Sequence, residues 1–480
     1  MDFVLQWGAM DKKSKIGILG GGVEGLAAAA YLAAHGYRDV TLYDENTSLE
    51  DADGRFLGGT GSGDGALSGP PPVPAVLGMG AFDEIDECDT VFRSPGVHPD
   101  KLKGFGGEIT STIRFFMEKR RGVVIGVTGT KGKGTTSALI YEILQEDGRD
   151  AYLGGNIGES PLKFLDDLND DSLSVLELSS FQLQDLTVSP DVAVVLMTTS
   201  DHMDYHKDKD DYWMAKTPIA RFQGEDGVLI VNSDYDYAEA FLALGKGKKV
   251  GVSTKGMVEK GAFLSNGKIL YMSCDGGMCR REVIGETARV GLPGPHNLEN
   301  VLAAVCVARS LGVGIDVIQK VIYRFSGLEH RLELVREAFG VKFYNDSFST
   351  TPETCVAAAR AFDAPTFLIC GGSEKFSDYS DWARELEENM NVKAVFLIGD
   401  TAARMEEALK MAAMRGKVEE GKEFPLKVYM CGNLENALKE ARAQARAGDY
   451  VIMSPAAASF GLFKNYKERG KRFRELVRAL

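Results

Sequence analysis

The sequence has few cysteines, no long apolar run and no excess of positive charge. Seven scattered cysteines among 480 residues do not suit a disulfide framework, so we expect reduced thiols and a cytoplasmic location. Four residues separate Cys274 from Cys279, but no second pair or histidine lies nearby, so a zinc site is not predicted. No apolar run reaches the roughly 18 residues that a transmembrane helix needs.

The formal net charge of −14 argues against a general nucleic-acid-binding protein and against a basic membrane-binding surface. We therefore expect no nucleic-acid partner and no membrane partner, and we expect a monomer. An anionic ligand would have to be held by local basic groups and backbone amides. The length of 480 residues is typical of two to four domains.

A glycine-rich turn between an apolar strand and a helix is the most informative stretch. Val123–Val127 predicts a buried strand, the turn runs from Gly129 to Gly134, and Thr135–Gln145 predicts a helix. This order is typical of a phosphate loop, because glycines let backbone N–H groups approach phosphate oxygens at a helix N-terminus. Lys133 would place its charge on the outer phosphates and Thr135 a hydroxyl near Mg²⁺. A turn without a ligand is the alternative.

A second glycine motif lies near the N-terminus. Gly20–Gly25 reads G-x-G-x-x-G between a predicted strand, Lys15–Leu19, and a helix. Asp44 ends the next strand, about 20 residues further on, as in a dinucleotide-binding fingerprint. A nicotinamide-dependent dehydrogenase is therefore one interpretation, and a strand–helix–strand unit without a ligand is another.

From about residue 120 the sequence alternates between apolar strands and helices, which predicts a parallel sheet covered on both faces. Glu177 and His202 both follow such strands, at the edge where ligands bind in parallel sheets. Taken singly, Glu177 could cap a helix, His202 could be structural and Lys216 could be an exposed helical lysine. The last third of the chain repeats the α/β pattern, with glycine or serine turns after its strands.

Several stretches together resemble the Mur ligases, in order and over nearly the whole chain. The most specific are TGTKGKGTT (128–136), LELSSFQL (176–183), DHMDYH (201–206), YNDSFSTTPE (344–353) and SPAAASFGLFKNYKERG (454–470). The resemblance implies an α/β protein of three domains. These are a Rossmann-like UDP-substrate domain (1–118), a P-loop ATPase-type parallel-sheet domain (119–326) and a Rossmann-like amino-acid domain (327–480).

The same resemblance implies the residues of each site. Those near UDP and the sugar are Val23, Glu24, Asp44, Glu45, Asn46, Ser94 and Asn156. Those near ATP are Gly129, Thr130, Lys131, Gly132, Lys133, Gly134, Thr135, Thr136, Asn297, Asn300, Arg331 and Asp346. Those near the metal are Thr135, Glu177, His202 and Lys216, with Lys216 carbamylated. Those near the substrate and the incoming amino acid are Gln182, Thr350, Lys375, Ser459, Phe460 and Tyr466.

The implied reaction is an ATP- and Mg²⁺-dependent amide ligation. The carboxylate of UDP-N-acetylmuramoyl-L-alanine would attack the γ-phosphate, and the glutamate amine would then attack the acyl phosphate. Catalysis of this kind rests on positioning and electrostatics. The implied catalytic residues are Lys133, Glu177, His202, Lys216, Arg331 and Asp346.

Three positions depart from the pattern of the glutamate-adding branch. Lys131 stands where a loop asparagine is usual, and Gly134 where serine or threonine is usual. Phe348 stands where the D-glutamate enzymes have a lysine, so one cation is missing from the amino-acid site. The C-terminal motif favours D-glutamate as substrate, and the L-glutamate-adding relatives of this branch are the alternative.

Overall fold

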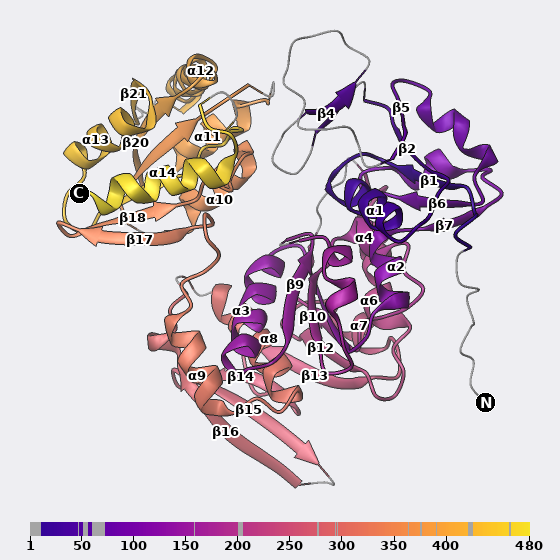
Figure 1. The fold of residues 1–480 in the computed structure, drawn as a ribbon. Helices are drawn as coiled ribbons and strands as arrows, with labels where there is room; N and C mark the ends of the chain where they lie inside the picture. The colour runs from indigo at the N-terminus through magenta and orange to yellow at the C-terminus, as the bar shows by residue number, and fades with distance from the viewer. Residues whose placement is uncertain are drawn as a thin grey trace. The chain divides into compact units, whose positions relative to one another are not determined.

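The computed structural model describes residues 11–46, 48–50, 56–59, 73–157, 159–199, 205–275, 278–292, 294, 296–362, 364–374, 377–389, 391–420, 426–459 and 462–480. Three predicted site residues, His202, Lys375 and Phe460, lie outside this part of the chain. The chain divides into two compact units, Met1–Phe325 and Ser326–Leu480 (Figure 1). No helix in the described ranges is long and apolar enough to cross a membrane.

The first unit begins with a five-stranded sheet in the order β5-β2-β1-β6-β7, in which every pair is parallel. Its strands are β1 (Ile16–Leu19), β2 (Val40–Asp44), β5 (Ala75–Leu77), β6 (Thr90–Arg93) and β7 (Glu108–Thr110). Two helices, α1 (Val23–Ala34) and α2 (Thr112–Lys119), belong to it, and a short antiparallel pair joins β3 (Ser48–Glu50) to β4 (Phe56–Gly59). The strand order changes direction at β1, so the carboxyl ends of β1 and β6 border the crevice where such folds bind ligands.

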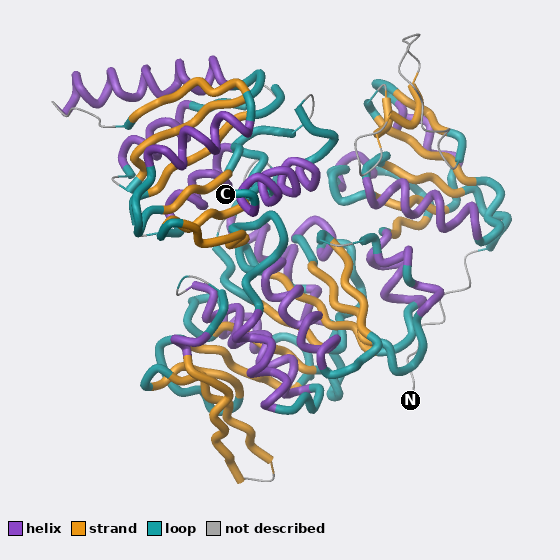
Figure 2. The backbone as a smooth tube through the Cα atoms, turned by 60° about the vertical axis from the view of Figure 1, so that its left-hand side comes forward, coloured by secondary structure: helices purple, strands orange, loops and turns teal. Residues whose placement is uncertain are grey.

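The same unit contains a nine-stranded sheet in the order β16-β15-β14-β13-β12-β11-β8-β10-β9. Its parallel strands are β8 (Val123–Thr128), β9 (Ala151–Gly155), β10 (Leu173–Glu177), β11 (Val192–Val195), β12 (Val228–Asn232), β13 (Lys248–Ser253) and β14 (Gly261–Ser265). The alternation in the sequence predicted this parallel part. An antiparallel hairpin of β15 (Lys268–Asp275) and β16 (Met278–Glu286) extends the sheet and projects from it in Figures 1 and 2, and the sequence pattern did not predict it.

Helices cover both faces of the nine-stranded sheet. On one face α3 (Lys133–Glu146), α8 (His296–Ser310) and α9 (Ile315–Arg324) share a core that includes Leu139, Val301 and Val321. On the other face lie α4 (Ser180–Leu183), α5 (Lys209–Lys216), α6 (Pro218–Arg221) and α7 (Ala238–Leu242). The core on this face is continuous with that of the five-stranded sheet, since Ile18 and Ile219 belong to one cluster. This shared core explains why both sheets form one compact unit.

The second unit has a six-stranded sheet in the order β17-β18-β22-β19-β20-β21, with only β17 antiparallel. Its strands are β17 (Glu333–Ala338), β18 (Val341–Asn345), β19 (Thr366–Gly371), β20 (Val392–Ile398), β21 (Lys427–Gly432) and β22 (Tyr450–Met453). One face packs against α10 (Pro352–Arg360), α11 (Ser380–Glu388) and α12 (Ala402–Glu420), and the other against α13 (Leu434–Gln444) and α14 (Tyr466–Arg478). The carboxyl ends of β18, β22 and β19 therefore lie side by side.

The cysteines depart in part from the sequence-based expectation. Cys274 and Cys279 form a disulfide, so the prediction of uniformly reduced thiols is wrong for this pair. The physical reason is the hairpin register, which places the two residues opposite one another, and a spacing of five residues does not reveal a hairpin. The other five cysteines, Cys88, Cys306, Cys355, Cys370 and Cys431, carry free thiols.

Candidate active site

The phosphate loop has the backbone geometry that the glycines predicted. Gly132 has a φ of 85° and precedes the first residue of α3, Lys133. A β-carbon at Gly132 would lie 2.2 Å from the Asn300 side-chain oxygen, so a larger residue does not fit. The Lys133 ammonium donates to the carbonyls of Gly129 at 3.0 Å and Thr130 at 3.1 Å, which places its charge against the inside of the turn.

Two predicted ATP-side residues on α8 are joined to the loop helix. The Asn300 side-chain oxygen accepts a 3.2 Å hydrogen bond from Thr136, and its amide donates to the Asn297 side chain at 2.9 Å. Thr135 is half-buried in the first turn of α3, between the buried residues Gly134 and Thr136. The structure therefore brings the beginnings of α3 and α8 together, as the sequence predicted for one nucleotide site.

The loop is also fixed to the segment that follows β11. The Thr130 backbone donates to the Met197 carbonyl at 2.7 Å, and its hydroxyl accepts from the Thr199 backbone at 2.9 Å. The same hydroxyl lies 3.1 Å from the Tyr212 hydroxyl on α5. The sequence analysis did not assign Tyr212 a role, and its place four residues before Lys216, on the same helix face, is the signal that could have found it.

Lys216 is buried rather than exposed. Only 1% of its surface is accessible, which contradicts the alternative of an exposed helical lysine. Its ammonium donates to the Gly129 carbonyl at 3.3 Å and the Thr128 hydroxyl at 3.4 Å, and it lies 4.4 Å from the centre of the Tyr212 ring. A lysine on α5 therefore meets the end of β8, where the phosphate loop begins.

Glu177 is the last residue of β10, which pairs with β8, the strand that leads into the phosphate loop. In this pairing Glu177 lies opposite Val127. It is 4% exposed, and one carboxylate oxygen accepts a 2.9 Å hydrogen bond from Asn156. The other oxygen is buried and has no hydrogen-bond partner among the described residues. Because an unpaired buried carboxylate oxygen is costly and oxygen is the ligand that Mg²⁺ prefers, this environment fits a magnesium ion. Ser179, and not Glu177, caps the following helix α4, so the helix-cap alternative is wrong.

The described residues contain no cluster of three or more histidine, cysteine or acidic side chains that could hold a metal ion.

Gln182, which was predicted to lie near the substrate, completes the capping box of α4 with Ser179. Its amide also donates to the carboxylate of Glu24 on α1. Burial raises the pKa of Glu24 to about 7, although the bond from Gln182 opposes that shift. Glu24 thus faces α4, between the two sheets of this unit.

Most residues predicted for the UDP side lie at the carboxyl ends of β1, β2 and β6, whereas Asn156 follows β9 and contacts Glu177. Asp44 accepts hydrogen bonds from the Gly21 backbone at 2.6 Å and the Asn46 backbone at 2.8 Å. The Ser94 hydroxyl donates to the Gly20 carbonyl at 2.9 Å. Val23 is 54% exposed at the beginning of α1, and the exposed Glu45 pairs with a lysine at 2.8 Å, Lys101. The backbone around the glycine turn is therefore held in place by Asp44 and Ser94.

The sequence analysis missed Arg93, which directly precedes the Ser94 turn. Its side chain is 1% exposed and donates to Asp185 at 2.8 Å and to the Phe181 carbonyl at 2.9 Å. It also donates to the carbonyl of Val97, within the turn. An arginine at the end of a buried apolar strand, in the run Thr90–Arg93, is the sequence signal that could have identified it.

Asp346 in the second unit is surrounded by donors of its own unit. Its carboxylate accepts from Ser349 at 2.5 Å, Ser454 at 2.7 Å and the Leu332 backbone at 3.1 Å. Burial raises the pKa of Asp346 to about 6, against the effect of these hydrogen bonds and of Arg331. Asp346 therefore links the end of β18 to the end of β22.

Two of the remaining predicted residues of the second unit, Arg331 and Tyr466, contact the ring of Phe348. The guanidinium of Arg331 lies 4.8 Å from the centre of the Phe348 ring, and that ring meets Tyr466 edge-on at 5.2 Å. Thr350 is half-buried between β18 and α10, and Ser459 is buried after β22. Phe348, the residue that departs from the family pattern, is thus in direct contact with a cation.

Arg469 on α14 is a second buried cation that the sequence analysis missed. It donates to the Ser347 side chain at 3.0 Å and to the carbonyls of Ala457 and Ala458 at 3.1 Å each. Burial lowers its pKa to about 9. The KERG end of the C-terminal motif contains this residue, and its reach across two strand ends explains how α14 holds the loops that follow β18 and β22.

A phosphate loop between β8 and α3, with a buried carboxylate at the end of the neighbouring strand, defines a nucleotide-binding α/β enzyme. The chain belongs to the Mur ligase family. Residues 127–308 match the Mur ligase middle domain, and residues 330–457 match the domain described as Mur ligase, glutamate ligase domain. These matches leave the dehydrogenase alternative without support.

Two relatives match almost end to end. A UDP-N-acetylmuramoylalanine–D-glutamate ligase of Acetivibrio thermocellus is 38% identical, covering 98% of this chain and 97% of its own. One of the same name from Ruminiclostridium cellulolyticum is 35% identical, with the same coverage of 98% and 97%.

Solved Mur ligases share the fold. A MurC from Thermotoga maritima is 17% identical with a TM-score of 0.54 and covers 97% of this chain and 99% of its own. A MurF from the same organism, solved with ADP, is 18% identical with a TM-score of 0.52 and covers 93% of this chain and 92% of its own. At these identities the likeness concerns the three-domain α/β architecture alone.

Proposed function

We propose that this chain is an ATP-dependent ligase that joins D-glutamate to UDP-N-acetylmuramoyl-L-alanine in cytoplasmic peptidoglycan precursor synthesis. One observation carries the proposal. This chain is 38% identical over nearly its whole length to a D-glutamate ligase. Its fold brings Lys133, Glu177 and Lys216 to the carboxyl ends of neighbouring strands. The reaction type follows from these groups, and the choice of substrates rests on the relatives.

The phosphate loop would bind the triphosphate of ATP. Backbone N–H groups at the beginning of α3 and the Lys133 ammonium supply positive charge, which favours the transfer of a phosphoryl group to the substrate carboxylate. Glu177, whose second oxygen has no partner among the described residues, would hold Mg²⁺ with Thr135 nearby. A bound magnesium ion would neutralise phosphate charge. His202 stays a predicted ligand outside the described residues.

Lys216 would be carbamylated in the active enzyme. Its amine is buried beside the carbonyl of Gly129 and the Tyr212 ring, within reach of the loop that binds phosphate. Carbamylation requires the neutral amine, because that is the form that reacts with CO₂. The carbamate would replace a cation by an anion at the edge of the sheet, next to Thr128.

The acceptor would lie along the carboxyl ends of β1 and β6. Asp44 and Ser94 fix the Gly20–Gly25 turn. Asn156, which would lie near the sugar, donates a 2.9 Å hydrogen bond to Glu177. The roles of Arg331 and Asp346 towards ATP, the amino-acid contacts of the second unit and the domain boundaries at 118 and 326 stay predictions.

The deciding assay measures ADP release with UDP-N-acetylmuramoyl-L-alanine and each glutamate enantiomer in turn. We expect ADP and phosphate, and turnover that requires both the acceptor and D-glutamate. AMP as the product, or ATP turnover that is indifferent to both substrates, would remove the ligase assignment. A clear preference for L-glutamate would keep the ligase class and change the substrate. A Lys133→Ala variant that folds and releases no ADP ties the turnover to this loop.

A further inference from the structure

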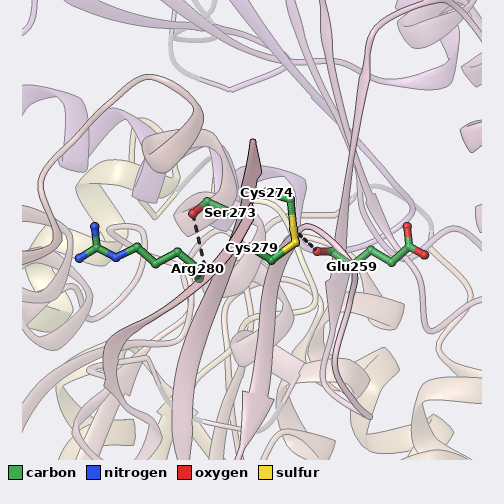
Figure 3. The surroundings of a disulfide bond; sticks show 5 residues. All are labelled: Glu259, Ser273, Cys274, Cys279 and Arg280. Carbon is green, nitrogen blue, oxygen red and sulfur yellow. Dashed lines mark hydrogen bonds between the residues drawn. A yellow bond between two sulfur atoms is a disulfide. The ribbon is translucent and has the colours of Figure 1, made fainter. Parts of the chain in front are cut away.

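A pair of cysteines lies near the end of the hairpin formed by β15 and β16, two strands that contain no residue assigned to the ligase. Cys274 and Cys279 are directly opposite one another in the hairpin register, with their Cα atoms 4.1 Å apart. Cysteines whose Cα atoms are more than about 7 Å apart cannot be bridged without moving the backbone, and this pair lies well within that limit. Figure 3 shows the bridge between the two strands, with Glu259 beside it.

Both cysteines of the hairpin are at least partly exposed to solvent. Cys279 is exposed and Cys274 is half-buried, whereas Cys88, Cys306, Cys355 and Cys370 are buried. Exposure matters for thiol–disulfide exchange, because the incoming sulfur must approach the bridge in line with the S–S bond. Cys279 is the one exposed cysteine of the seven, and Cys431 is half-buried like Cys274. Of the two pairs of neighbouring cysteines, the hairpin pair is therefore the one open to small thiols and disulfides, since Cys355 and Cys370 are buried.

The surroundings suit both redox states. The Cys274 sulfur lies 3.3 Å from the Glu259 carbonyl oxygen, so a reduced Cys274 has an acceptor for its S–H group in place. Arg280 and Arg281 follow Cys279 and are exposed. The thiolate of the attacking cysteine is the nucleophile in exchange. Neither state leaves a buried polar group without a partner, because the pair is at the surface.

We propose that Cys274 and Cys279 are a thiol–disulfide exchange site for low-molecular-weight thiols and disulfides. The Cys279 thiolate attacks one sulfur of a small disulfide, forms a mixed disulfide and releases one thiolate. The Cys274 thiolate then attacks the Cys279 sulfur, closes the bridge and releases the second thiolate. Two protons leave the cysteines and two electrons reduce the small disulfide. A dithiol reverses both steps.

The test follows both cysteines in one tryptic peptide, Ile269–Arg280, using the full-length protein in its folded state. The protein is treated with dithiothreitol or with oxidised glutathione, alkylated with N-ethylmaleimide, digested and analysed by mass spectrometry. After dithiothreitol we expect both cysteines to be alkylated. After oxidised glutathione we expect complete loss of both alkylation sites and a bridged peptide two hydrogens lighter, which a second dithiothreitol treatment reverses.

Two controls separate exchange from general oxidation. In a Cys274→Ser variant the resolving thiol is gone, so Cys279 should keep a glutathione adduct instead of forming a bridge. Cys431 is half-buried and unpaired with another cysteine, and it should show the same alkylation before and after the dithiothreitol step. A wild-type bridge that resists dithiothreitol, or glutathione adducts without a bridged peptide, would overturn the proposal. ATP turnover is no part of this readout, so it stands apart from the proposed ligase function.

Discussion

The guanidinium of Arg331 rests over the ring of Phe348, 4.8 Å from its centre, and Tyr466 supports the same ring from the edge. Phe348 stands where a lysine was expected, so this contact changes what the position supplies. The site loses the lysine charge and gains an aromatic face that holds the charge of Arg331. The substitution therefore removes the lysine charge and adds an aromatic contact to the cation of Arg331.

Replacing Phe348 tests this arrangement. A cation–π contact at an exposed site contributes about 0.5–1 kcal/mol, so Phe348→Leu should lower kcat/KM about 2- to 5-fold. Phe348→Trp keeps an aromatic face and should retain the wild-type value within about 2-fold. The measurement is ADP release with the concentrations of ATP and D-glutamate varied separately, which shows which substrate depends on Arg331. Equal losses in the leucine and tryptophan variants would mean that packing, and not the cation–π contact, matters here.

Asp346 should give the second unit a pH-dependent stability. Its pKa is raised by burial to about 6 in the folded chain, above an unfolded value near 3.8. The folded state therefore binds more protons between these values, and the contribution of Asp346 to stability falls as pH rises through this window. A shift of two pKa units corresponds to about 3 kcal/mol. Above about pH 7 the contribution should be constant.

The comparison of wild type with Asp346→Asn isolates this effect, because asparagine does not titrate. The free energy of unfolding of the variant minus that of wild type should rise by about 3 kcal/mol between pH 4 and pH 7. Trp382, buried in α11, reports on this unit when Trp7 and Trp213 are changed to phenylalanine in both proteins. A Ser454→Ala variant removes a hydrogen bond that lowers the pKa, so its window should move to higher pH. A pH-independent difference would contradict the raised pKa.

Much of the fold could be predicted from the sequence, because buried parallel strands are apolar runs that end in glycine or serine turns. The predicted strands Lys15–Leu19 and Val123–Val127 each differ from the observed β1 and β8 by one residue at one end. The hairpin of β15 and β16 could not be predicted, since its exposed strands carry charged and polar residues such as Arg280 and Glu282. The disulfide depended on that hairpin and was missed with it.

The site was predictable where the chemistry itself selects the residue type. Lys133, Glu177 and Lys216 follow from a phosphate loop and a family resemblance, and the structure brings them to one edge of the sheet. Arg93 and Arg469 were missed, because each contacts backbone carbonyls of distant segments. Carbonyl acceptors leave no trace in a sequence, so the sequence can mark Arg93 as unusual at the end of an apolar strand, but only the fold shows what either arginine contacts.

The buried pair of Arg93 and Asp185 should be important for the stability of the first unit. Asp185→Ala would leave the Arg93 charge, which is 1% exposed, without its counter-ion, and we expect a loss of about 3–5 kcal/mol in the free energy of unfolding. Asp170→Ala is the matched control. It breaks an exposed pair with Arg121, whose side chains are 59% and 81% exposed, and should cost about 0–1 kcal/mol. Denaturant unfolding of the three proteins gives the comparison, and equal losses would show that burial does not matter here.

Lys216 offers a direct test of the proposed carbamate. Lys216→Ala should lower turnover on the order of 100- to 1,000-fold, because it removes a charged group next to the phosphate loop. Added acetate or formate should restore part of the activity by supplying a carboxylate in the vacated space. Lys209→Ala is the control, since Lys209 lies on the same helix but is exposed above the Trp213 ring and should leave turnover unchanged. In wild-type protein with ¹³C-bicarbonate, carbon NMR should show a carbamate signal that Lys216→Ala lacks. A signal that persists in this variant would place the modification on another lysine, and full activity of the variant would remove Lys216 from the mechanism.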